Sequence, residues 1–159
     1  MEIDTLARAV SHELKRQGLM LVTAESCTGG WMAQVMTSVA GSSEWFERGF
    51  VAYTNLAKRE MLGVKTTILS RYGAVSEQTA RAMAEGALTH SHAQVALAIT
   101  GIAGPSGGTP EKPVGTVCFA WAGKKRDTSS IKQVFSGDRE AVRRQAVTTA
   151  LQGLLDFLH

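Results

Sequence analysis

The segment of this chain that most restricts its fold is a strand that runs directly into a glycine-rich turn and a helix. An apolar run at 19–22 is followed by the letters T-A-E-S-C-T-G-G at 23–30, and a helix-patterned run comes next. This order is typical of α/β proteins, in which the free N–H groups at the start of the helix favour negative charge in the turn. The turn also holds Ser26, Cys27 and Thr28, which can act as nucleophiles or hydrogen-bond donors. We therefore expect the chemistry of this protein at the turn.

Apolar residues recur along the rest of the chain at helical and strand spacing. Helices are predicted at 3–17, 31–39, 56–62, 77–90 and 139–158, and strands at 20–23, 46–54, 95–100, 114–121 and 128–135. Asn55, Ser76 and Asp138 are predicted to cap the last three of these helices. The last strands follow one another too closely for crossover helices, which favours a mixed sheet. The chain is therefore predicted to be one α/β domain over 1–159, in which a mixed β-sheet is flanked by layers of helices.

The charge of the chain argues against nucleic acid as a partner. Seventeen Lys and Arg residues against fourteen Asp and Glu residues give a formal net charge of +3, and the longest basic block is 124–126. A nucleic-acid-binding surface concentrates more positive charge than this. The hydrophobic fraction of 44% excludes a disordered chain.

Neither a membrane segment nor a metal site is expected. The longest apolar run is far shorter than the roughly 20 residues that cross a bilayer, and the N-terminal residues carry acids too early for a signal peptide. The two cysteines, Cys27 and Cys118, lack the spacing of metal ligands, and the four histidines lie at polar or terminal positions. These features predict a cytoplasmic protein with reduced thiols and no metal.

Turns rich in glycine or serine follow several of the predicted strands. They lie at 25–30, 41–43, 101–108 and 136–138. In open α/β sheets, ligands bind beyond the carboxyl ends of the strands, where such turns gather, although each turn taken alone is equally well explained as a tight reversal. None has the phosphate-loop or the dinucleotide-binding pattern. Nucleoside triphosphate hydrolysis and hydride transfer are therefore not indicated, and no cofactor is predicted.

Hydroxyl chemistry at Ser26 would require a base. A serine is a poor nucleophile unless a neighbouring group takes its proton, and no histidine is well placed. The segment 53–58 offers Tyr53 and Lys58 where a strand passes into a helix. Burial would lower the pKa of Lys58 and let its amine act as a base near neutral pH. The alternative is that Lys58 is an exposed helix lysine, which is the commoner environment for this residue type.

Three arginines lie near the start of the last predicted helix. Arg139 and Arg143 are four residues apart on one face, and Arg144 lies beside them. Cations at a helix N-terminus oppose the macrodipole by a few tenths to about 1 kcal/mol each, so this placement favours a bound anion such as a phosphate. The alternative is that the arginines are exposed and pair with Asp138 or Glu140.

Six segments of the chain resemble one known family. They are T-A-E-S-C-T-G-G-W at 23–31, A-G-S-S-E-W-F-E-R-G-F-V-A-Y-T-N at 40–55, G-A-V-S-E at 73–77, T-G-I-A-G-P-S-G-G at 100–108, K-P-V-G-T-V at 112–117 and S-G-D-R-E-A-V-R-R-Q-A at 136–146. In this order, they are similar to the CinA C-terminal domain family, and the resemblance covers essentially the whole chain. It is strongest to the stand-alone bacterial members, and no additional N-terminal domain is expected.

The resemblance implies an activity and a set of site residues. The stand-alone members hydrolyse the carboxamide of nicotinamide mononucleotide (NMN) to nicotinate mononucleotide and ammonia, a step of pyridine nucleotide salvage. Ser26 matches the nucleophile and Lys58 its partner base, with Tyr53 nearby. An oxyanion is expected at the N–H groups of the glycine turn, and the phosphate at one of the three arginines. The substrate-binding positions that the motifs imply are Thr28, Gly29, Gly30, Ser43, Asn55, Thr100, Gly101, Arg139, Arg143 and Arg144.

Two other functions stay open at the level of sequence. A catalytically silent, nucleotide-binding paralogue would keep the family fold without the activity. A role in DNA uptake or damage response is suggested by the family's historical name, but the modest charge argues against direct contact with DNA. A homo-oligomer, with a dimer favoured, is expected because family members associate and because Trp45, Phe46 and Phe50 are predicted on an exposed face.

Overall fold

The computed structural model describes residues 2–159. Along the chain, the elements are α1 (Ile3–Gln17), β1 (Leu21–Glu25), α2 (Trp31–Thr37), the 3-10 turn η1 (Ser42–Glu44), β2 (Phe46–Val51), α3 (Asn55–Leu62), α4 (Thr66–Tyr72), α5 (Glu77–Thr89), β3 (Val95–Gly101), β4 (Thr116–Gly123), β5 (Arg126–Val134) and α6 (Arg139–Leu158). This order agrees with the prediction except for η1 and α4, which the sequence pattern does not indicate.

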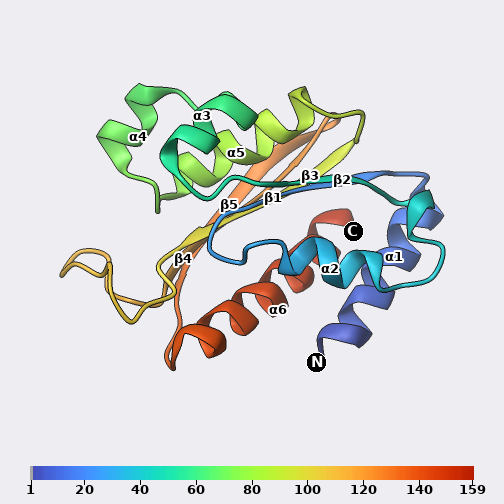
Figure 1. Ribbon diagram of the computed structural model, residues 1–159. Helices are drawn as coiled ribbons and strands as arrows, with labels where there is room; N and C mark the ends of the chain where they lie inside the picture. The colour runs from blue at the N-terminus through green and yellow to red at the C-terminus, as the bar shows by residue number, and fades with distance from the viewer. Residues whose placement is uncertain (1) are drawn as a thin grey trace.

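The strands form one mixed sheet in the order β2-β1-β3-β4-β5 (Figure 1). β1 pairs in parallel with both β2 and β3, whereas β3, β4 and β5 form successive antiparallel pairs. A tight turn joins β4 to β5, while the parallel strands are connected through helices, as parallel pairing requires. The predicted mixed sheet is therefore confirmed.

Helices cover both faces of the sheet. In Figure 1, α3, α4 and α5 lie above the sheet, and α1, α2 and α6 lie below it. Because successive strand residues point to opposite faces, Leu97 and Ile99 of β3 join the core on the α6 side, while Ala96 and Ala98 join the core on the α5 side. The small alanines leave room for α5 to lie close to the sheet. The predicted layered α/β architecture is confirmed.

The path of the chain opens a crevice at the carboxyl ends of β1 and β2. These strands are neighbours, but the helix that follows β1 lies below the sheet and the helix that follows β2 lies above it. The loops at the two strand ends consequently diverge. In α/β sheets, ligands bind at such switch points, so the topology places a site where the glycine turn leaves β1.

The helix caps follow the prediction with one exception. Ser76 and Asp138 cap α5 and α6 by accepting backbone N–H groups, as expected. α3 is capped by Thr54 instead, whose hydroxyl accepts the N–H of Ala57 at 3.0 Å, and Asn55 is the first residue of the helix. Asn55 is therefore wrong as a cap. Thr and Asn are both favourable N-cap residues, so the sequence alone does not choose between two adjacent ones.

Two further features differ from the sequence prediction. Trp45 is buried, with its ring against Gly41, whereas Phe46 and Phe50 are half-buried. The placement of Trp45 on an exposed face is therefore wrong. The sequence pattern does not indicate α4, because the first three residues of this helix are β-branched and have low helix propensity.

Within residues 2–159, no helix combines the length and the apolar character needed to cross a bilayer.

Candidate active site

Ser26 is the first residue of the turn that leaves β1. Its N–H donates to the carbonyl of Ile99 at 2.9 Å, so the residue extends the parallel pairing of β1 with β3 before the chain turns. Its side chain is almost buried, and Oγ lies 3.3 Å from the carbonyl oxygen of Tyr53. The expected nucleophile is thus held firmly at the carboxyl end of the sheet.

Lys58 reaches Ser26 from the first turn of α3. Its Nζ lies 3.1 Å from Ser26 Oγ and 3.0 Å from the carbonyl oxygen of Tyr53. The side chain is 1% exposed, so the alternative of an exposed helix lysine is wrong. Burial lowers the pKa of the amine below its ordinary value of 10.5.

Neutral groups surround the Lys58 amine. Within residues 2–159, no Asp or Glu forms an ion pair with it. A carboxylate there would stabilise the ammonium form and raise the pKa. Without one, burial shifts the equilibrium of the amine toward its neutral form, and a neutral amine 3.1 Å from a hydroxyl can accept its proton.

Tyr53 contributes its backbone, and not its phenol, to this pair. The carbonyl faces both Ser26 and Lys58, whereas the phenol accepts a hydrogen bond from Arg139 at 3.2 Å, and the residue as a whole is 57% exposed. In the described part of the chain, no hydrogen bond joins the phenol to Ser26. The phenol therefore belongs to the rim of the site.

A cavity of about 200 Å³ opens over the serine–lysine pair. It brings together residues from the ends of β1 and β3, the start of α3 and the start of α6. Its lining residues are Ser26, Cys27, Tyr53, Asn55, Lys58, Ala74, Val75, Thr100, Gly101, Ala103 and Arg139. A larger hollow of about 610 Å³ lies beside Trp31 and Arg144, but its two hydroxyl groups, on Ser38 and Thr148, donate to backbone carbonyls and not to a side-chain base.

Thr100 and Gly101 form the wall of the cavity at the end of β3. The hydroxyl of Thr100 donates to the carbonyl of Ala74 at 2.8 Å, so its lone pairs are left to accept a donor from a ligand. A Cβ on Gly101 would lie 2.8 Å from a Val117 methyl group and 3.0 Å from Cys27 Sγ. Glycine is therefore required at this position by close packing.

The three arginines of α6 have different surroundings. Arg139 lines the cavity, and besides Tyr53 it donates to the carbonyl of Gly104 at 2.7 Å. Arg143 does not line the cavity and donates instead to backbone carbonyls of the glycine turn. Arg144 is exposed and lies 3.5 Å from Glu140. Only Arg139 therefore has access to a ligand in the cavity.

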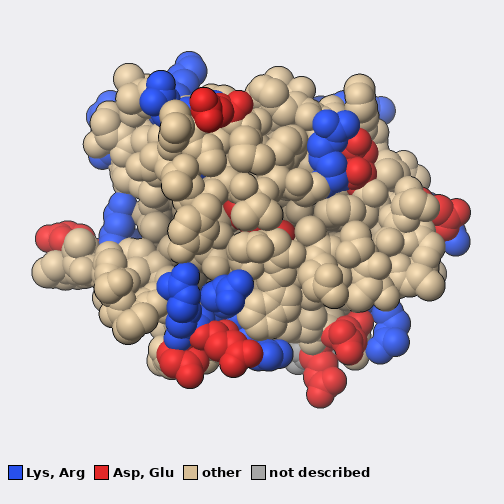
Figure 2. Space-filling model, viewed as in Figure 1, with Lys and Arg blue, Asp and Glu red and all other residues tan. Residues whose placement is uncertain are grey.

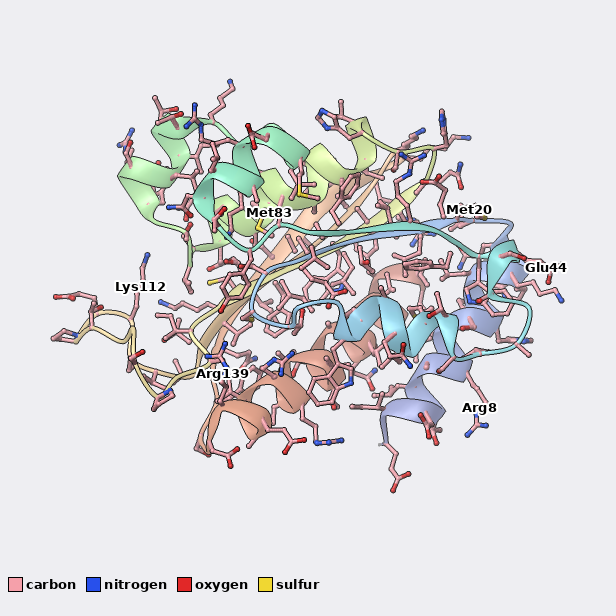
Figure 3. All side chains as sticks on the ribbon, viewed as in Figure 1. Arg8, Met20, Glu44, Met83, Lys112 and Arg139 are labelled. Carbon is pink, nitrogen blue, oxygen red and sulfur yellow. The ribbon has the colours of Figure 1, made fainter. Side chains whose placement is uncertain are left out.

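Arg139 is labelled in Figure 3, where it rises from the N-terminal end of α6 toward the sheet. Figure 2 shows basic side chains gathered at this end of the helix, directly above acidic ones. At this end of the helix, Asp138 is the N-cap and Glu140 lies in the first turn. The positive charge at the cavity mouth is therefore local and compact.

Sequence reasoning missed Glu25, the last residue of β1. Its buried carboxylate accepts a hydrogen bond from the hydroxyl of Thr28 at 2.7 Å. It also accepts hydrogen bonds from the N–H groups of Met32 and Ala33 at 2.8 and 3.0 Å. These bonds tie the glycine turn to the start of α2. The available signal was an acidic residue at the end of an otherwise apolar strand, because a carboxylate is rarely buried without partners.

The backbone of the turn leaves the N–H groups of Cys27, Thr28 and Gly30 without an acceptor among residues 2–159, and the first two directly follow the nucleophile. The N–H of Gly29 donates to the carbonyl of Ser26 at 3.1 Å, so Gly29 is not available to an oxyanion, contrary to one of the expected choices. The N–H groups of Cys27 and Thr28 donate to no other residue among 2–159. A substrate oxyanion near Ser26 would find its donors there.

Cys27 is not a competing nucleophile. Its side chain is buried, and burial raises the pKa of the thiol to about 12. The thiol is therefore protonated at neutral pH. Of the possible nucleophiles in the turn, Cys27 therefore packs beside Ser26 without competing with it.

Ser43 is the predicted site residue that the structure does not bring to the cavity. It is exposed in η1, and the carbonyl of the nearby Trp45 accepts the N–H of Leu21 at the start of β1. Ser26 follows the other end of β1, roughly 17 Å away for a five-residue strand. In Figure 3, Glu44 of η1 lies at the right edge of the molecule and Arg139 lies left of its centre.

The remaining predicted residues border the site without lining it. Gly30 adopts a positive φ of 103° at the start of α2, which suits a residue without a side chain. Within residues 2–159, no three His, Cys, Asp or Glu side chains gather as a metal-binding group.

A serine hydroxyl beside a buried lysine amine, at the switch point of a mixed sheet, defines an α/β protein with a serine–lysine site. Comparison with known proteins identifies the family. The family model described as the CinA C-terminal domain matches residues 3–158. The chain belongs to this family.

Several relatives are similar over nearly their whole length. The nicotinamide-nucleotide amidohydrolase PncC of Escherichia coli (strain K12) is 54% identical over 153 residues, which are 96% of this chain and 93% of that protein. The protein of the same name from Pseudomonas putida is 50% identical over 155 residues, 98% of this chain and 96% of the relative. The crystal structure of the competence/damage inducible protein CihA from Agrobacterium tumefaciens superposes with a TM-score of 0.97 at 47% identity, covering 100% of this chain and 97% of that chain.

Proposed function

We propose that this protein is an amidohydrolase that converts NMN and water to nicotinate mononucleotide and ammonia. The observation that carries the proposal is the 3.1 Å contact between Ser26 Oγ and the buried Lys58 amine at the base of a cavity. The relatives that bear the name nicotinamide-nucleotide amidohydrolase are 50–54% identical to this chain over nearly its full length. Pyridine nucleotide salvage is the corresponding biological role.

In the proposed reaction, Ser26 Oγ attacks the carboxamide carbon while the neutral Lys58 amine takes the hydroxyl proton. The tetrahedral intermediate collapses when the resulting ammonium returns that proton to the leaving nitrogen, so ammonia departs and an acyl-enzyme remains. Water then attacks the ester carbon, with Lys58 acting again as base. Ser26 leaves with a proton, and nicotinate mononucleotide is released.

The free N–H groups of Cys27 and Thr28 are the proposed oxyanion donors. In each half of the reaction, negative charge develops on the former carboxamide oxygen. Preorganised backbone donors at this position typically contribute a factor of about 100 to 1,000 to kcat each. Thr100, whose hydroxyl already donates a hydrogen bond to the carbonyl of Ala74, is placed to accept a hydrogen bond from the carboxamide NH₂ group.

Arg139 is the proposed ligand of the phosphate. Its guanidinium lies at the cavity mouth, where a phosphate remote from the reacting carboxamide would sit. A charge-assisted bond there would hold the substrate so that its carboxamide faces Ser26. Arg143 and Arg144 are less suited, because neither lines the cavity.

The test is the identity of the product. NMN incubated with the protein in water enriched in oxygen-18 should yield nicotinate mononucleotide with one heavy oxygen in its carboxylate, measured by mass spectrometry. A carboxylate without the label, or cleavage at the glycosidic bond instead of the amide, would contradict the proposal.

We also propose that the protein acts in the cytoplasm as a homo-oligomer, with a dimer favoured. The edge strand β2, with half-buried Phe46 and Phe50 and exposed Val51, supports an association surface. Light scattering coupled to size exclusion should give the mass of two or more chains, each of 17.0 kDa. A mass of one chain at micromolar concentration would contradict the oligomer.

A further inference from the structure

We propose that Arg143 is a positioning residue of the active site: its guanidinium fixes the peptide groups of the glycine turn so that the oxyanion donors face the substrate. This inference rests on the proposed amide hydrolysis. It assigns Arg143 to catalysis through the backbone, and not to the phosphate, although Arg143 and Arg139 look equivalent in the sequence.

Arg143 binds the turn with one edge of its guanidinium. Nε donates to the carbonyl of Cys27 at 3.0 Å, and a terminal nitrogen donates to the carbonyl of Thr28 at 3.1 Å. Two adjacent donors on two successive carbonyls form a fork that only arginine supplies. The guanidinium carbon lies over the ring of Trp31, the first residue of α2, 5.5 Å from the ring centroid, and this cation–π contact adds a further anchor for the group.

The fork decides where the N–H groups of the turn point. In a trans peptide, the C=O and N–H bonds point in opposite directions. Because Arg143 holds the carbonyl of Cys27, the N–H of Thr28 points away from Arg143. The carbonyl of Ser26 is likewise held by the N–H of Gly29, so the N–H of Cys27 points away from that bond. Like the N–H of Gly30, these two N–H groups donate to no other residue among 2–159.

The turn has a second anchor on its other side. Glu25 accepts hydrogen bonds from the hydroxyl of Thr28 and from two N–H groups of α2. Thr28 is consequently held through both its side chain and its carbonyl, by groups of opposite charge from different elements. The carbonyl of Thr28 also accepts the N–H of Trp31 at 3.0 Å. The carbonyl of Cys27, in contrast, is held by Arg143 alone among residues 2–159.

The expected consequence of losing Arg143 is a specific defect in turnover. In Arg143→Ala, the peptide group between Cys27 and Thr28 loses the donor that holds its carbonyl, so the N–H of Thr28 is no longer aligned with the developing oxyanion. We expect kcat for NMN to fall roughly 10- to 100-fold, because small misplacement of catalytic groups has effects of this size. KM should stay within about threefold, since the phosphate is held at Arg139. Arg139→Ala should show the reverse pattern.

The matched control is Arg126→Ala. Arg126 also donates to a backbone carbonyl, that of Phe157, and its guanidinium stacks on the Phe157 ring, but it lies away from the cavity. Its loss tests the general effect of removing an arginine that bridges elements, and kcat should be unchanged. Arg143→Lys serves as the second variant, because it keeps the charge and the fold but cannot form the fork, and its kcat should lie between those of the wild type and Arg143→Ala.

Two readouts separate positioning from a purely structural role. Guanidinium chloride at about 50 mM is far below denaturing concentrations and should restore part of the kcat of Arg143→Ala but not of Arg126→Ala or the wild type. The aldehyde analogue of NMN should form a tetrahedral adduct when Ser26 Oγ adds to its carbonyl and Lys58 takes the proton. The affinity of Arg143→Ala for this analogue should fall by about the same factor as kcat, with its affinity for nicotinate mononucleotide unchanged.

The inference is overturned if Arg143→Ala keeps the kcat of the wild type, or if it raises KM as Arg139→Ala does. It is also overturned if guanidinium gives no rescue and both ligands lose affinity equally. These outcomes require a wild type that releases ammonia from NMN. A wild type that does not release ammonia contradicts the proposed function itself, so the two failures are distinguishable.

Discussion

Lys58 is buried in a way that stability alone does not explain. It is one of the largest fully buried side chains in the described chain, and its amine meets only a hydroxyl and a carbonyl. Burying an ammonium group without a carboxylate is unfavourable. A residue that destabilises the fold at the base of a cavity is best explained by its chemistry.

Replacing Lys58 by methionine should therefore separate activity from stability. We expect kcat of Lys58→Met to fall roughly 100- to 10,000-fold, the usual contribution of a general base. The free energy of unfolding at pH 7 should rise by about 1 kcal/mol, since an apolar chain of similar length replaces a buried amine. Ammonia release and urea unfolding measure the two effects.

The stability difference should depend on pH with a definite sign. Because burial lowers the pKa of Lys58 in the folded protein, the unfolded chain binds more protons between this lowered pKa and the ordinary value of 10.5. The stability of the wild type therefore rises with pH across that window, and the advantage of Lys58→Met shrinks. A difference that is constant up to pH 10.5 would contradict the lowered pKa.

Arg139 carries the second prediction at the residue scale. Arg139→Ala removes the one arginine that faces the cavity, and KM for NMN should rise about 10- to 100-fold, as expected for a charge-assisted bond of about 1.5–3 kcal/mol. The increase should be absent for nicotinamide riboside, which lacks the phosphate. Steady-state kinetics on both compounds make the comparison, and an equal loss on both would rule out the phosphate contact.

At the scale of elements, the site depends on how β1 is joined to α2. Glu25 ends the strand and accepts the first free N–H groups of the helix, so one carboxylate satisfies donors that a short helix leaves unpaired. The Ser26 turn lies between these two anchored elements. Its rigidity therefore depends on a residue that does not line the cavity.

Glu25→Gln should weaken this junction. The amide keeps one acceptor oxygen but places an NH₂ group against N–H donors, and we expect the free energy of unfolding to fall by about 1–3 kcal/mol. Urea denaturation followed by circular dichroism measures the change. Glu140→Gln, an exposed acidic residue in the first turn of α6, is the control and should change stability by less than about 0.5 kcal/mol. Equal effects of the two changes would contradict the anchoring role of Glu25.

The close contact between α5 and α3 is not indicated by the residue pattern of either helix. Gly86 lies within α5, where a Cβ would come 1.9 Å from the carbonyl oxygen of Leu62 at the end of α3. The glycine thus lets α5 lie directly against the helix that carries Lys58. A glycine inside a helical pattern signals only lower helix propensity, so this contact follows from the tertiary structure alone.

For the whole molecule, the sequence predicted the architecture more completely than the site. Periodicity and short connections were sufficient for the layered mixed sheet, because these signals are local. The contact between Ser26 and Lys58, 32 residues apart, depends on the parallel pairing of β1 with β2. No spacing in the sequence encodes that distance, and only the family resemblance joined the two residues.

The other site predictions divide according to tertiary position. Thr100 and Gly101, which the motif placed among the substrate-binding residues, line the cavity because β3 ends beside β1. Ser43 does not, because η1 precedes β2 at the opposite end of the sheet. The arginines of α6 could not be ranked from the sequence, since helical spacing places two of them on one face while only tertiary structure shows which one meets the cavity.

The most direct test of the central claim is ammonia release from NMN by the purified protein and by Ser26→Ala, with nucleotide binding measured by calorimetry on both. The structure predicts that the wild type releases one ammonia for each NMN consumed, and that Ser26→Ala binds NMN and releases none above the uncatalysed rate. Equal release by both proteins would contradict the serine mechanism. Binding by both without release by either would show a nucleotide-binding paralogue and not an enzyme.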